Sequence, residues 1–179
     1  MTVRTLSAAS TMAEVLEAYP AAQRALFRKY HIGGCSSCGF QPTDKLTDVL
    51  RSHDCQDSIE SVIAYIQESQ AVDDKTKVRA KTLKQWLDAK EPLRLIDMRG
   101  PDEAAICKLP GSTLISQEVV RQMNEEWPKD TKIVLYCHRG MRSADGAAYL
   151  AGHGFTNVWT LDGGILAWAD EVEPTMKRY

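Results

Sequence analysis

The sequence lacks the features of a membrane-spanning or secreted protein. None of its apolar runs approaches the roughly 20 residues that a helix needs to cross a bilayer. The N-terminal segment lacks the apolar core of a secretory signal, because Glu14 and Glu17 interrupt it early. The net charge of −2 provides no basic field for nucleic acid or for an anionic membrane surface. These absences predict a cytoplasmic protein with neither nucleic acid nor a membrane among its partners.

The cysteines also lack the pattern of a secreted disulfide framework. There are five of them, an odd number with one close pair: Cys35, Cys38, Cys55, Cys107 and Cys137. In a reducing compartment such residues serve as metal ligands, redox dithiols, nucleophiles or ordinary core residues. The composition, 44% hydrophobic and 26% charged, is that of an ordinary globular protein. The function therefore depends on which of these roles the cysteines have.

Residues 1–68 predict a small all-α domain. Four helices are expected, beginning near Thr11, Pro20, Thr43 or Asp44, and Asp57. The first has the capping-box spacing of Thr11 and Glu14, and apolar residues follow on one face. Residues 69–77 are polar, charged and without a period, so we interpret them as a linker.

Residues 78–179 predict a second domain, in which strands and helices alternate. Short apolar runs of strand length lie at 93–97, 132–136 and 157–160, and helical patterns lie at 83–89, 118–126 and 143–152. This order is typical of an α/β domain whose parallel sheet is flanked by helices. Ligands of such sheets bind at the carboxyl ends of the strands. Cys137 is the first residue after one of the expected strands.

The loop after that strand has the composition of a nucleophile site. It consists of Cys137, His138, Arg139, Gly140, Met141, Arg142 and Ser143. Gly140 permits a tight turn, and Ser143 is a suitable N-cap for the next helix. Inward-pointing N–H groups and the helix dipole would stabilise a thiolate at Cys137, and the basic residues of the loop favour an anionic donor or a persulfide anion. The alternative is a small buried residue at a strand end, which would not need a glycine-containing basic loop.

Residues 78–174 resemble the rhodanese family of sulfurtransferases. The loop carries this resemblance together with LIDMR at 95–99, LPGS at 109–112, GFTNV at 154–158 and LDGGILAW at 161–168. The resemblance implies a rhodanese-like fold and a Cys137 persulfide, formed from thiosulfate or a related donor and passed to a thiophilic acceptor without a cofactor. It implies that Arg142 braces the loop or binds the donor anion, and that Asp97 and Arg99 support the loop.

Two details qualify the resemblance. Four residues separate Cys137 from Arg142, whereas related phosphatases have the longer C-x5-R loop that accommodates a tetrahedral phosphate. The smaller ring suits a single sulfur atom and argues against a phosphatase. The chain also has Cys107 and Lys108 where the family often has Gly-His, and we interpret Cys107 as a partly buried residue.

The remaining motif is Cys35-Ser-Ser-Cys38, in a segment (residues 11–54) that resembles a small helical domain of unknown function. The two thiols could form a disulfide, bind a metal or an Fe–S cluster, accept sulfur from Cys137, or serve only structure. A four-ligand site would need His31, His53 or Cys55, or the cysteine pair of a second chain in a homodimer.

Three functions follow from these motifs. The first is an enzyme that transfers sulfur from a small anionic donor to a thiol or protein acceptor. The second is a persulfide carrier or redox sensor whose acceptor is a partner protein. The third is a metal-binding regulator in which the rhodanese-like domain serves as a docking module.

Overall fold

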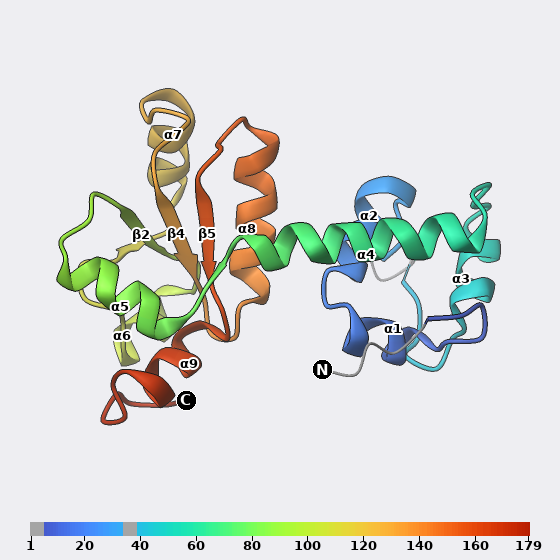
Figure 1. Cartoon of the computed structure of the whole chain (residues 1–179), viewed down its shortest axis with the longest axis horizontal. Helices are drawn as coiled ribbons and strands as arrows, with labels where there is room; N and C mark the ends of the chain where they lie inside the picture. Colours follow the sequence, from blue (N-terminus) through green and yellow to red (C-terminus); the bar gives the residue numbers. More distant parts are fainter. Residues whose placement is uncertain (1–5, 34–38) are drawn as a thin grey trace. The chain divides into compact units, whose positions relative to one another are not determined.

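The computed structural model describes residues 6–33 and 39–179. The chain divides into two compact units, Met1–Lys75 and Thr76–Tyr179, which we call the N-terminal and C-terminal units (Figure 1). Among the described residues, no helix combines the length and the apolar character that crossing a membrane requires.

The N-terminal unit is helical in its described part. Its helices are α1 (Met12–Ala18), α2 (Ala22–Tyr30), α3 (Leu46–Ser52) and α4 (Ile59–Lys75). The capping box expected at the start of α1 is confirmed, because the Thr11 N–H donates to Glu14 Oε2 at 2.8 Å and the Glu14 N–H donates to Thr11 Oγ1 at 3.3 Å. Apolar side chains from all four helices form one core, which includes Met12, Leu26, Leu46, Val62 and Ile66.

The segment expected to be a linker, residues 69–77, is mostly helical. Helix α4 continues to Lys75, and the first strand begins at Lys77. Polar residues interrupt the apolar pattern of a helix in this segment, but two of them contact α2. Gln70 Oε1 accepts the N–H of Ala21 at 3.0 Å, and Asp73 forms an ion pair with Arg24. These contacts with α2 stabilise the last turns of α4, although the sequence there has no apolar helical pattern.

The C-terminal unit is an α/β domain with a five-stranded, wholly parallel sheet in the order β1-β5-β4-β2-β3. Its elements are β1 (Lys77–Val78), α5 (Ala80–Asp88), β2 (Arg94–Asp97), α6 (Pro101–Ile106), β3 (Thr113–Leu114), α7 (Gln117–Glu125), β4 (Ile133–Tyr136), α8 (Met141–Gly152), β5 (Val158–Leu161) and α9 (Gly164–Glu171). The expected fold class is therefore confirmed, with β4 as the central strand.

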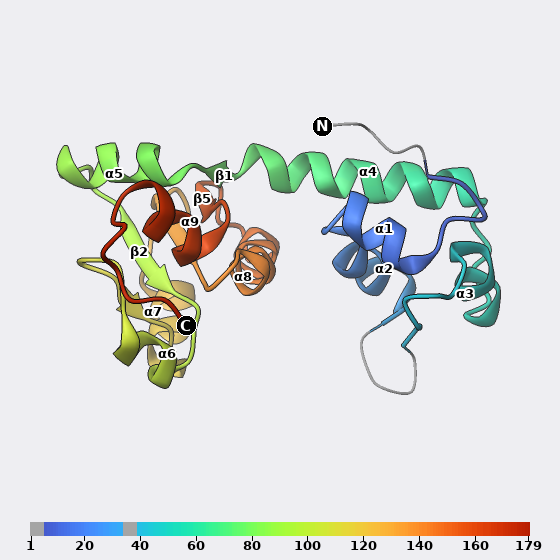
Figure 2. The same cartoon turned by 90° about the horizontal axis from the view of Figure 1, so that it is seen from below.

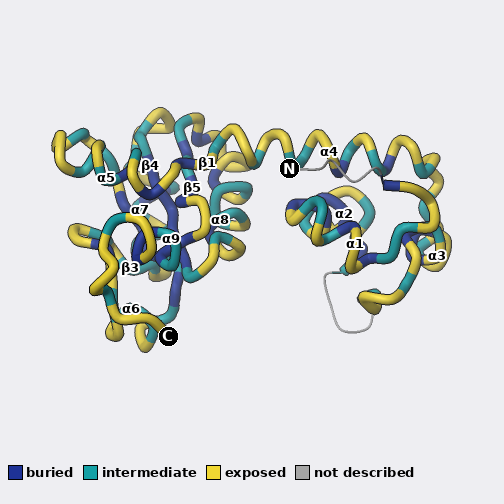
Figure 3. Tube along the Cα trace, turned by 60° about the horizontal axis from the view of Figure 1, so that its bottom comes forward, coloured by how far each residue is buried: buried dark blue, intermediate teal, exposed yellow. Residues whose placement is uncertain are grey.

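The two faces of the sheet are covered by different helices (Figure 2). Val134 and Tyr136 belong to the core that α5 and α9 complete, whereas Ile133 and Leu135 belong to the core completed by α7 and α8. This alternation follows from the two-residue period of a strand. All four residues of β4 are buried, and the buried positions of this unit are concentrated in its strands (Figure 3).

Candidate active site

Cys137 lies at the carboxyl end of the central strand, where the chain leaves β4 and turns into α8. The residue is 1% exposed. The Gly140 N–H donates to Cys137 Sγ at 3.1 Å, and Ser143 Oγ lies 3.6 Å from the same sulfur. The sulfur is therefore held by a backbone N–H at the start of a 12-residue helix, where the helix dipole favours negative charge.

The cap of α8 differs from the sequence-based expectation. Gly140 is the N-cap, with φ at 102° and ψ at −13°, and Ser143 lies within the first turn. The positive φ of Gly140 completes the turn in fewer residues than expected, so the helix begins at Met141. Ser143 Oγ donates to the carbonyl of Gly140 at 3.0 Å, and this hydrogen bond joins the first turn of α8 to the loop.

The loop is also held by the start of α9. The N–H of Ile165 donates to the carbonyl of Cys137 at 2.9 Å, and the N–H of Leu166 donates to that of His138 at 3.3 Å. Gly164 has a φ of 64°, and a Cβ atom there would lie 2.5 Å from both carbonyl oxygens. Only glycine permits this approach. We included this glycine in the motif at 161–168 but expected no particular role for it.

Asp97 and Arg99 form a buried ion pair, and their expected role in supporting the loop stays a prediction. Arg99 Nε and Nη2 donate to the two carboxylate oxygens of Asp97 at 2.8 and 2.6 Å, and Nη2 also donates to the carbonyl of Cys107 at 2.7 Å. Burial raises the pKa of Tyr136 to about 12, so its hydroxyl stays protonated and donates to Asp97 at 2.8 Å. Tyr136 precedes Cys137, so the pair is linked directly to the strand that carries the thiol.

Arg142 is paired with a carboxylate that the sequence reasoning missed. Its two terminal nitrogens donate to Glu103 at 2.5 and 2.7 Å, and this contact holds the pKa of Glu103 at about 2. The Tyr179 hydroxyl accepts from Arg99 at 2.8 Å and donates to Glu103 at 3.0 Å, while its ring centroid lies 4.6 Å from that of His138. These contacts join residues about 40 and 80 positions apart, so no local pattern indicates them.

The other loop residues differ in exposure. His138 is half-buried and its Nδ1 is buried without a hydrogen-bond partner among the described residues, whereas Arg139 and Met141 are exposed. Burial, and after it the charge of Arg139, lowers the pKa of His138, which favours the neutral ring. Cys107 is partly buried, as expected.

Cys35 and Cys38 lie outside the described residues, so their expected redox or metal role stays a prediction. Within residues 6–33 and 39–179, no group of three or more His, Cys, Asp or Glu side chains is arranged to hold a metal ion. His53, one of the ligands considered, has its Nδ1 2.9 Å from the carbonyl oxygen of Val49.

The fold and this site define an α/β protein with a buried cysteine at the carboxyl end of its central strand, in a loop closed by a helix N-terminus. The chain belongs to the rhodanese-like domain family, because the model of that family matches residues 79–171, just over half of the chain. The match lies within the C-terminal unit and leaves α1 to α4 outside it.

Several named proteins are similar to this part of the chain. A sulfurtransferase from Allochromatium vinosum is 36% identical over 93 residues, which are 52% of this chain and 87% of that protein. The probable adenylyltransferase/sulfurtransferase MoeZ from Mycobacterium tuberculosis is 36% identical over 104 residues, 57% of this chain and 26% of MoeZ. The chain thus spans about a quarter of the length of MoeZ. A rhodanese-like domain protein from Staphylococcus aureus matches in structure with a TM-score of 0.47 and 27% identity, over 54% of this chain and 94% of that one.

Proposed function

We propose that the protein is a sulfurtransferase that carries sulfane sulfur on Cys137, from thiosulfate or a persulfide donor to a thiophilic acceptor. The observation that carries this proposal is the contact of Cys137 Sγ with the Gly140 N–H at the N-terminus of α8. Several relatives of the C-terminal unit are named as sulfurtransferases, which supports the same reaction type.

In the first step the Cys137 thiolate attacks the outer sulfur of thiosulfate. A new S–S bond forms on Cys137, the sulfur–sulfur bond of thiosulfate breaks, and sulfite leaves with the bonding electron pair. The product is a persulfide on Cys137. The Gly140 N–H stabilises the attacking thiolate, since it donates to Sγ and is already in place before the step.

In the second step a nucleophilic acceptor takes the outer sulfur, and Cys137 leaves as the thiolate. Arg142 contributes positive charge at the loop, reduced by its pairing with Glu103. Asp97 and Arg99 act as positioning residues, because their buried pair fixes the end of β2 beside Tyr136 and β4. The sulfur transfer needs no metal or organic cofactor, because the cysteine itself is the carrier.

Steady-state turnover of thiosulfate with cyanide as the acceptor tests the proposal. Cys137→Ser should abolish thiocyanate formation, whereas Cys107→Ser, which changes another cysteine of the same unit, should retain it. Turnover in Cys137→Ser would contradict the assignment. If Cys137 is loaded with sulfur but no small acceptor supports turnover, the result would instead favour a persulfide carrier that delivers sulfur to a partner protein.

For the N-terminal unit we propose that Cys35 and Cys38 accept sulfur from the Cys137 persulfide or bind a metal or Fe–S cluster. The double substitution Cys35→Ser with Cys38→Ser should lower turnover with thiol acceptors if the pair takes part in transfer. Unchanged rates would refute the sulfur-acceptor role, and purified protein without metal or a visible absorption band would refute the metal role.

A further inference from the structure

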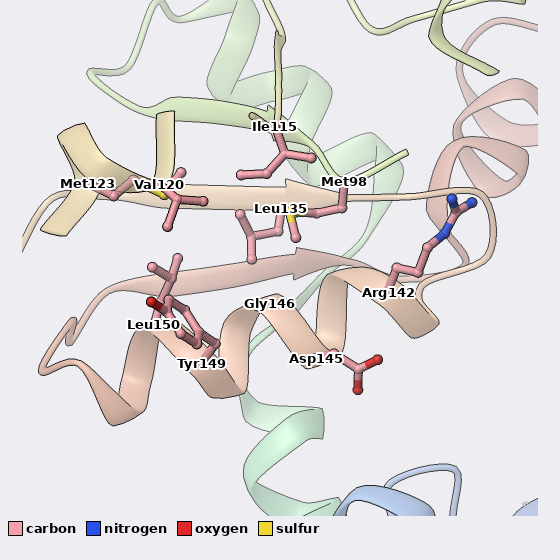
Figure 4. A pocket seen from close by; sticks show the side chains of 10 residues that line it. All are labelled: Met98, Ile115, Val120, Met123, Leu135, Arg142, Asp145, Gly146, Tyr149 and Leu150. Carbon is pink, nitrogen blue, oxygen red and sulfur yellow. The ribbon is translucent and has the colours of Figure 1, made fainter. Parts of the chain in front are cut away.

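The C-terminal unit contains an apolar pocket that has no role in the sulfur transfer as proposed above. It has a volume of about 580 Å³ and lies between α7 and α8 on one face of the sheet (Figure 4). Its apolar lining comes from Met98, Ile115, Val120, Met123, Leu135 and Leu150. The volume is within the range of small-molecule sites, which are mostly apolar with a few polar groups.

The pocket adjoins the Cys137 loop at Arg142. Leu135 of β4 lines it and precedes Cys137 by two positions. Arg142, a member of the loop, lies at one end of the pocket (Figure 4). Cys137 Sγ itself contacts Ser143 of α8, the helix that forms one wall. A molecule in the pocket would therefore have one end beside the loop that carries the thiol.

The chemistry of the lining excludes the small anionic donor as the occupant. Thiosulfate is a dianion without an apolar part, and moving it against apolar side chains would cost its hydration. Arg142, a cationic side chain in the lining, already has a carboxylate partner in Glu103. The pocket thus suits a hydrocarbon group and selects little for negative charge.

Gly146 determines how much of this space is open. It lies in the interior of α8 with an ordinary helical backbone, so its conformation does not require glycine. A Cβ atom at this position would lie 2.8 Å from Cε of Met98 and 3.1 Å from Cδ1 of Leu135. The missing side chain lets Met98 lie against the helix. A methyl group there would push the thioether into the pocket.

We propose that this pocket binds the hydrocarbon chain of the sulfur acceptor, which is a small thiol with an aliphatic tail. The inference rests on the proposed function and names the substrate class of its second step. The acceptor thiol first loses its proton to solvent, and the Cys137 persulfide takes up a proton from solvent. The acceptor thiolate then attacks the outer sulfur of the protonated persulfide, a new S–S bond forms on the acceptor, the old one breaks, and Cys137 leaves as the thiolate. The product is the hydropersulfide of the acceptor.

A series of linear alkanethiols from ethanethiol to hexanethiol tests the proposal, with thiosulfate as the donor. Thiol acidity changes little along the series, so a change of kcat/KM with chain length reflects burial of the hydrocarbon chain. Each added methylene should raise kcat/KM about three- to fourfold, the factor expected for burying one CH₂ group. The measured quantity is this dependence on chain length within each variant.

Gly146→Ala should flatten the dependence, because it moves Met98 into the space for the chain. Gly152→Ala is the matched control: it adds the same methyl group to the same helix, and no atom of the described residues lies within 4 Å of it. It should retain the wild-type dependence. Alanine favours helix over glycine by about 1 kcal/mol, so neither variant is expected to unfold. Met98→Ala should extend the dependence to longer chains.

The outcomes separate the two proposals. A flat dependence in the wild type, with normal thiocyanate formation from cyanide, would overturn the pocket assignment and leave the sulfur transfer in place. An equal dependence in Gly146→Ala and wild type would also overturn it, because the chain would then bind elsewhere. Absence of a Cys137 persulfide would refute the sulfur transfer and, with it, the acceptor assignment.

Discussion

Gly164→Ala should destabilise the C-terminal unit more than any other single methyl addition at its glycines. The new Cβ would lie 2.5 Å from the carbonyl oxygens of Cys137 and His138, and both are backbone atoms that cannot rotate away. Reaching ordinary contact requires a shift of about 1 Å between α9 and the loop. That shift breaks the hydrogen bonds from Ile165 and Leu166, at about 1 kcal/mol each. The left-handed backbone adds roughly 1 kcal/mol, so the expected loss is about 3 kcal/mol.

Gly154→Ala isolates the backbone part of this cost. Gly154 has a φ of 87°, and within the part of the chain that the structure describes no atom lies within 4 Å of the new methyl group, so about 1 kcal/mol is expected. Urea unfolding followed by tryptophan fluorescence compares the two variants, because all four tryptophans lie in the C-terminal unit. Gly164→Ala should also lower kcat/KM on the order of 100-fold, since the thiol loop is displaced by about 1 Å. Equal unfolding midpoints for the two variants would refute the reasoning.

Three further predictions concern the charged residues around the loop. Asp97→Asn leaves the buried Arg99 without its carboxylate and should lower the free energy of unfolding by about 3–5 kcal/mol. The same urea titration measures this loss, and a wild-type midpoint would contradict the pairing. Glu103→Gln leaves Arg142 without its counter-charge and should lower KM for thiosulfate about two- to fivefold at low salt, with no difference at high salt. The pKa of Glu103 is held at about 2, below its ordinary 4.5. The difference in free energy of unfolding between wild type and Glu103→Gln should therefore be constant above about pH 5 and shrink as the pH falls toward 2. A difference that grows on acidification would contradict this sign.

The central part of the site could be predicted because its signals are local. The apolar run at 132–136 became β4, and the residue after it became the buried Cys137. The parallel sheet followed from alternating strands and helices. The two-residue strands β1 and β3 are too short to show a period, and they form only because β5 and β2 provide partners.

The supporting contacts could not be predicted because they join distant parts of the chain. Glu103 meets Arg142 across 39 residues, and Arg99 meets Tyr179 across 80. The cap of α8 was assigned to Ser143 because serine is a common N-cap, but the positive φ of Gly140 started the helix earlier. The Gly163-Gly164 pair was the one local signal for the support of the loop by α9, since a glycine between a strand and a helix often marks a close backbone approach.

Intact mass after incubation with thiosulfate tests the central claim most directly. The protein should gain the mass of one sulfur atom, lose it on treatment with cyanide, and show no gain in Cys137→Ala. Cys107→Ser should gain the same mass as wild type. An unmodified wild-type protein, or the same adduct in Cys137→Ala, would contradict the assignment of Cys137 as the sulfur carrier.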